Sequence, residues 1–105
     1  MSDLRIENSS IEYVKVLVVT DTDPTANTVK MAIVPAKTDP TGFQTAAWVG
    51  TSTLVQGKYQ TYARILVGTG SAIGALTEGI YDTYVEIVAT PEDIILQANG
   101  TVTIY

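Results

Sequence analysis

The segment 68–74, Gly-Thr-Gly-Ser-Ala-Ile-Gly, has the glycine-rich composition of a loop that could bind phosphate. Such a loop works because the helix that follows it presents free backbone N–H groups to the phosphate. Only Ala75 to Glu78 separate this segment from Gly79 and the next predicted strand, so no helix fits there. The glycine spacing is also one residue longer than in the dinucleotide-binding motif. We therefore expect segment 68–74 to be a flexible connection between two sheets.

Two groups of acids could act as metal ligands or as proton donors. Asp21-Thr22-Asp23 offers oxygen atoms, but a calcium loop normally supplies six or more, often with a bidentate glutamate. Pro24 directly after this group favours an ordinary turn. Glu92-Asp93 follows Pro91 in a second turn, and its neighbours give no reason for the raised pKa that acid catalysis needs. We expect no metal site and no catalytic carboxylate.

The chain contains no histidine and no cysteine. Histidine is the usual general base and the commonest metal ligand, and cysteine supplies disulfides and reactive thiols. The Ser-His-Asp mechanism and the usual zinc-hydrolase mechanisms are therefore excluded. We expect a protein that is not an enzyme, has no catalytic residue and needs no cofactor.

The net charge of −5 arises from eleven acids and six bases, and the bases are scattered along the chain. A nucleic-acid footprint needs a basic stripe, so we expect no nucleic-acid partner. The longest aliphatic run in the first half, residues 16–19, is far too short to span a membrane. The first residues do not resemble a signal peptide, so we expect synthesis in the cytoplasm and no membrane partner.

Apolar residues alternate with a period of two along most of the chain, which predicts strands. The expected strands cover residues 12–20, 29–34, 46–53, 61–67, 81–87, 94–96 and 101–105. Asn99-Gly100 is expected to form a two-residue hairpin turn, because both residue types tolerate positive φ. No stretch of ten residues has a helical apolar period, so about seven short strands predict an all-β sandwich.

A tyrosine corner is predicted where the strand around residues 81–87 begins. Leu76, Gly79, Tyr81 and Val85 have the spacing found where a strand opens in immunoglobulin-like sandwiches. In that corner the tyrosine ring packs in the core and its hydroxyl bonds to the backbone upstream. The pattern predicts an immunoglobulin-like antiparallel β-sandwich, and it carries no chemistry of its own.

Residues 1–10 are a short N-terminal arm or an edge strand, and residues 11–105 are expected to form a single domain. Leu4 and Ile6 alternate with Asp3 and Arg5 in the arm. The arm is therefore a candidate either for pairing within its own domain, which we favour, or for contact with a neighbouring molecule.

Large aromatic side chains are the other candidates for contact with a partner. Trp48 is either a partly buried core residue or an exposed anchor, and Phe43 nearby adds some weight to the second interpretation. The tyrosines offer either a sugar-binding platform or cross-strand packing. The tyrosines to which this applies are Tyr59, Tyr62 and Tyr84.

Over nearly its whole length the chain resembles the small immunoglobulin-like β-sandwich proteins of tailed bacteriophage virions. The residues that carry the resemblance are 13–16, Asp21-Thr22-Asp23-Pro24, 79–87 and the ending 91–105. The ending is similar to that of proteins from phages that infect actinobacteria. It implies a non-enzymatic virion protein present in many symmetric copies or as a homo-oligomer, with phage capsid or tail proteins as partners.

Within the virion, the leading hypothesis is a capsid decoration or minor capsid protein that binds and stabilises the assembled shell. One alternative is a tail, collar or head-tail junction protein, for example one that attaches fibres. A further alternative, from a different class, is a module that binds carbohydrate or the host surface.

Overall fold

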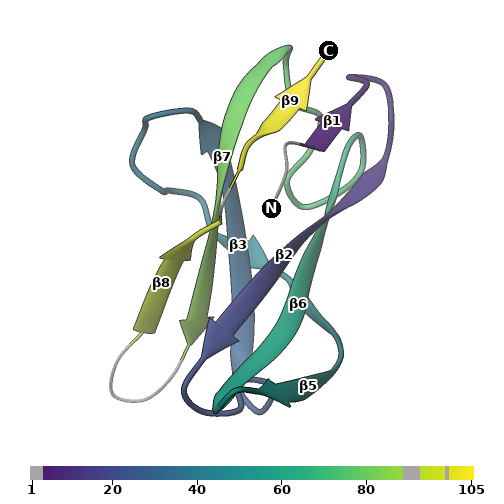
Figure 1. Ribbon diagram of the computed structural model, residues 1–105. Helices are drawn as coiled ribbons and strands as arrows, with labels where there is room; N and C mark the ends of the chain where they lie inside the picture. The colour runs from purple at the N-terminus through teal and green to yellow at the C-terminus, as the bar shows by residue number, and fades with distance from the viewer. Residues whose placement is uncertain (1–3, 89–92, 99) are drawn as a thin grey trace.

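Two β-sheets pack face to face in the computed structural model, which describes residues 4–88, 93–98 and 100–105 (Figure 1). The larger sheet has six strands in these residues: β1 (Leu4–Ile6), β3 (Thr28–Pro35), β4 (Gln44–Thr45), β7 (Gly79–Val88), β8 (Asp93–Gln97) and β9 (Val102–Ile104). The smaller sheet has three: β2 (Glu12–Thr20), β5 (Ala47–Val55) and β6 (Lys58–Val67). The described chain is therefore all-β, as the alternation predicts.

The chain passes between the two sheets several times along its length. The six-stranded sheet has the order β1-β9-β7-β3-β4, with β8 also paired to β7, and the three-stranded sheet has the order β2-β6-β5. All pairs are antiparallel except β1 with β9, which is parallel. Figure 1 shows β2, β6 and β5 on one side of the molecule, with β7, β8 and β3 on the other.

The hairpin predicted at Asn99-Gly100 is wrong. β8 pairs with the second half of β7 and β9 with its first residues, on the edge that β3 leaves free. Because β8 and β9 both run antiparallel to β7, the chain does not reverse between them. Gly100 has a φ of 82°, which suits glycine, and Ala98 donates its N–H to the carbonyl of Thr83 (2.9 Å). Asn99 lies outside the described residues.

Alternate residues of the long strands fill the space between the sheets. β2 buries Val14, Val16 and Val18, as the sequence predicts, and β7 buries Tyr81, Thr83, Val85 and Ile87. Burying one such aliphatic side chain contributes roughly 1.5–3 kcal/mol. The core residues from both sheets are Ile6, Val14, Val16, Val18, Val29, Met31, Ile33, Ala63, Ile65, Val67, Tyr81, Val85, Ile87, Val102 and Ile104.

The corner before β7 has the hydrogen bond that its motif predicts. The Tyr81 ring is buried, and its hydroxyl donates to the backbone carbonyl of Thr77 (2.8 Å). The Thr77 hydroxyl lies 3.1 Å from the Tyr81 hydroxyl oxygen. Leu76 packs against the core, and Gly79 is the first residue of β7. This bond fixes the crossing of the chain into the six-stranded sheet.

Candidate interaction surface

The glycine-rich loop between β6 and β7 uses its own N–H groups. Gly68 donates to the Gly74 carbonyl (3.0 Å), Ser71 donates to the Gly68 carbonyl (3.1 Å), and Gly74 donates to the Ser71 hydroxyl (3.0 Å). These groups are therefore not free to hold a phosphate. The loop connects the two sheets, as expected.

The acids that could have bound a metal are engaged with neighbouring side chains instead. Asp21 forms an ion pair with Lys58, and Asp23 accepts from the hydroxyl (2.7 Å) and the N–H (3.1 Å) of Thr25. The Thr25 hydroxyl, the Thr25 N–H and the Ser52 hydroxyl lower the pKa of Asp23 below its ordinary value of 3.8. Within residues 4–88, 93–98 and 100–105, no group of three acids is placed to hold a metal ion. Glu92 lies outside those ranges.

The four residues proposed as contacts all lie inward or partly covered. Leu4 packs against the core, and Ile6 is only 2% exposed, because β1 pairs with β9 in the same domain. Residues 4–6 thus form the end strand of the six-stranded sheet, and Ile6 is not available to a partner. Phe43 is half-buried. Trp48 also packs against the core and donates its indole N–H to the carbonyl of Asn27 (2.9 Å). It is therefore a partly buried core residue and not an exposed anchor.

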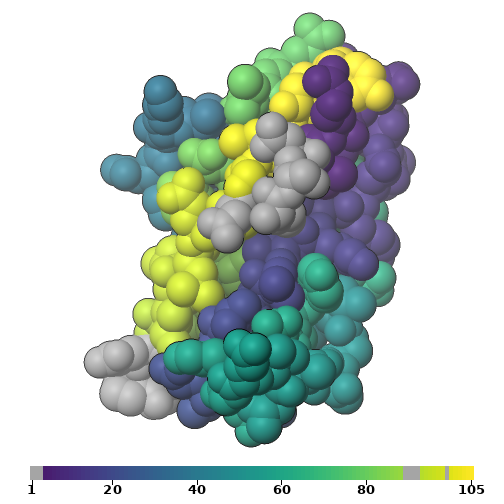
Figure 2. All heavy atoms as spheres, viewed as in Figure 1, coloured from purple at the N-terminus to yellow at the C-terminus, as the bar shows by residue number. Residues whose placement is uncertain are grey.

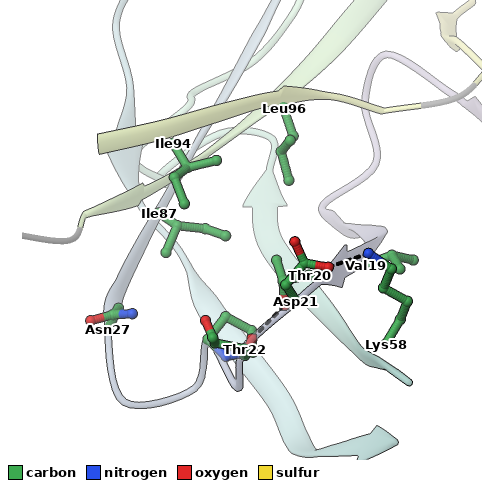
Figure 3. Close-up of a pocket in the computed structure, with 10 residues that line it drawn as sticks. Val19, Thr20, Asp21, Thr22, Asn27, Lys58, Ile87, Ile94 and Leu96 are labelled. Atoms are coloured by element: carbon green, nitrogen blue, oxygen red, sulfur yellow. Dashed lines mark hydrogen bonds and ion pairs between the residues drawn. The ribbon is translucent and has the colours of Figure 1, made fainter. Parts of the chain in front are cut away.

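A pocket of about 370 Å³ opens at the side of the molecule between the end of β2 and β8. In Figure 3, Ile94 and Leu96 point from β8 toward it and Ile87 faces them from β7. Figure 2 views this side, with β8 in yellow-green and the β5–β6 hairpin in teal below it. The ion pair of Lys58 with Asp21 lies at the rim. The lining combines aliphatic side chains with Thr20, Thr22 and Asn27, and its two charged residues, Asp21 and Lys58, pair with each other.

The outer face of the three-stranded sheet carries several exposed aromatic and aliphatic side chains that share one surface. We call it the cationic face, because Lys15 and Arg64 lie at its centre, directly opposite each other on β2 and β6. Its exposed apolar residues are Tyr13 (51% exposed), Leu17 (41%), Val19 (45%) and Tyr62 (45%). The register places Leu17 opposite Tyr62 and Tyr13 opposite Leu66.

Each cation of this face covers one of its tyrosines. The Arg64 guanidinium lies 4.3 Å from the centre of the Tyr13 ring, and the Lys15 ammonium 5.2 Å from that of Tyr62. Cation–π contacts hold both rings in place on the surface. The Arg64 Nε atom is buried and finds no hydrogen-bond partner among the described residues.

The sequence prediction missed this face, although the signal is present in residues 12–20. Val14, Val16 and Val18 are buried, while Tyr13 before them and Leu17 between Val16 and Val18 are also large and apolar. A half-buried strand normally alternates apolar with polar residues. The excess of apolar residues in this strand indicates a second apolar face.

In the described part of the chain, no helix is long and apolar enough to cross a membrane. Comparison of the chain with known protein families, with curated proteins and with solved structures finds no match.

Proposed function

We propose that the chain is an immunoglobulin-like β-sandwich. In that fold strands B, E and D form one sheet and C, F and G the other. Numbered along this chain, the B-E-D order matches β2-β6-β5, and the C-F-G order matches β3 and β7 followed by β8 and β9 together. The Tyr81 hydroxyl bond to Thr77 supports the same assignment. One difference is that β1 pairs with β9, whereas the first strand of the constant-type fold pairs with the second.

We further propose that this domain is a non-enzymatic structural protein of a tailed phage virion, and specifically a capsid decoration protein. The observation that carries the proposal is the cationic face, an open sheet surface with four exposed apolar residues suited to a flat protein contact. The resemblance noted above supplies the phage context. Many copies on a symmetric shell would each add a modest free energy of binding, and their sum would stabilise the shell.

The test is co-sedimentation of the purified chain with capsid shells that lack it. Saturable binding, with greater resistance of the shells to heat, is the expected result. Binding to isolated tails alone would move the assignment to a tail, collar or head-tail junction protein. Absence of the chain from purified particles by mass spectrometry would overturn the virion assignment.

A carbohydrate- or host-surface-binding module is the second candidate, and one observation favours it. Tyr13 and Tyr62 are both exposed on the same face, and sugar rings stack on exposed aromatic rings of this kind. A glycan array tests this candidate. Binding that is lost in Tyr62→Ala and kept in Tyr84→Ala would support it, whereas an array without hits would remove it.

A further inference from the structure

The cationic face concentrates positive charge in a chain that is acidic overall. The chain has eleven acids and six bases, yet the outward positions of β2 and of its paired partner β6 contain Lys15, Arg64 and, at the start of β6, Lys58, and no carboxylate. In residues 4–88, 93–98 and 100–105, the ion pair found joins Lys58 to Asp21 instead. The two central cations therefore have no carboxylate partner in the described structure.

The position of these cations is unfavourable for the isolated domain. Like charges directly opposite each other on antiparallel strands repel, and Lys15 and Arg64 are such a pair. A carboxylate placed between the two strands by a partner would relieve the repulsion and accept from the guanidinium.

We propose that the cationic face docks a protein surface that presents carboxylates flanked by aromatic or aliphatic side chains. The carboxylates would pair with Lys15 and Arg64, and the apolar groups would cover Tyr13, Tyr62 and Leu17. This proposal rests on the proposed function, because it names the surface and the partner chemistry for that contact.

The charge pattern argues against two other occupants. A second copy of the chain meeting the face symmetrically would bring Lys15 and Arg64 of both copies together, which is a repulsive arrangement. A nucleic acid needs many cations to neutralise successive phosphates, and this face offers two among exposed apolar residues. An acidic protein surface satisfies the charges and the apolar residues together.

The first experiment uses the full chain and a displayed library of random short peptides at low salt. Peptides selected on the unmodified chain are expected to be enriched in Asp and Glu next to aromatic or aliphatic residues. They should bind the double variant Lys15→Glu, Arg64→Glu roughly tenfold or more weakly, and binding should weaken as salt is raised.

The matched control reverses two other bases. Arg5 lies 5.0 Å from the ring centre of the exposed Tyr105, so Arg5→Glu with Lys37→Glu changes the net charge equally and also removes a cation from a tyrosine. This control should bind the selected peptides like the unmodified chain. The variant Lys15→Gln, Arg64→Gln removes charge without adding repulsion, and its thermal midpoint checks that loss of binding is not loss of fold.

The proposal is overturned by a selection that yields no binders, by binders without acidic enrichment, or by equal loss of binding in the control. Capsid shells then separate the two proposals. Shell binding that survives Lys15→Glu with Arg64→Glu would refute this docking face and leave the decoration role intact. Selected acidic peptides without binding to shells or tails would refute the virion role and leave the docking face intact.

Discussion

At the scale of single residues, the hydroxyl of Tyr81 links the corner to the strand that follows it. It donates to the Thr77 carbonyl at 2.8 Å in a largely buried position. Tyr81→Phe keeps the ring and leaves this carbonyl without its donor, so we expect a loss of about 1–2 kcal/mol in the free energy of unfolding. Urea denaturation measures this loss. An unchanged midpoint would mean that the bond does not stabilise the corner.

Thr83 is the opposite case, because its buried hydroxyl makes no hydrogen bond in the described structure that would offset its loss of hydration. It is 1% exposed, and its Oγ1 has no hydrogen-bond partner among the described residues. Thr83→Val replaces the hydroxyl with a methyl group of similar volume, so we expect the free energy of unfolding to rise by about 1 kcal/mol. Thr103→Val on the half-buried outer side of β9 is the control, with little change expected. Destabilisation by Thr83→Val would reveal a partner for this hydroxyl.

Asp23 makes stability depend on pH in the acid range. The Thr25 hydroxyl and N–H stabilise its carboxylate and lower its pKa in the folded chain below the ordinary 3.8. A lowered folded pKa means that the stabilisation is complete above the unfolded pKa and is lost as pH falls through the folded pKa. Asp23→Asn cannot ionise, so unfolding free energies measured from pH 5 downward should fall less steeply for this variant. Parallel curves for the two chains would contradict the assignment.

At the scale of elements, the loop between β6 and β7 depends on one glycine. A Cβ on Gly68 would lie 2.6 Å from the Ser10 carbonyl oxygen, and its φ is +125°. We expect Gly68→Ala to cost about 2 kcal/mol or more in the free energy of unfolding, because both the clash and the backbone strain oppose it. Gly70 also has positive φ (+88°), but a Cβ there meets nothing within 4 Å, so Gly70→Ala should cost about 1 kcal/mol. Chemical denaturation of both variants compares them, and equal costs would show that the clash relaxes.

The positions of the strands could be predicted from the sequence more reliably than which strands pair with each other. Period-two alternation identified the inward residues of β2 and β7, because it reports local burial directly. The turn at Asn99-Gly100 was predicted as a hairpin because its signal is equally local. Whether β8 pairs with β9 or with β7 depends on the ten-residue length of β7, which offers both strands one edge. Pairing between distant segments is not encoded in two turn residues.

For the whole molecule, two of the candidate contact residues, Ile6 and Trp48, lie against the core for a related reason. Ile6 and Trp48 were selected for their residue types, but the fold turns both side chains toward the core. The cationic face emerges only when the register aligns Lys15 with Arg64 and Leu17 with Tyr62 from strands far apart in sequence. The residues that share an exposed face of an all-β chain can therefore be identified only when the strand pairing is known.

β2 also lies at an edge of the three-stranded sheet, and Lys15 protects that edge. The strand pairs with β6 on one side, and residues 13–19 contain Lys15 as their one charged residue. Edge strands avoid pairing with other molecules by carrying a charge, most often lysine. Lys15→Val would create a continuous apolar strand of high β-propensity, so we expect faster, concentration-dependent aggregation on heating, measured by light scattering.

Lys30→Val in β3, which has β7 and β4 on its two sides, removes the same charge and should aggregate like the unmodified chain. Equal aggregation of both variants would show that net charge, and not the β2 edge, keeps the molecules apart.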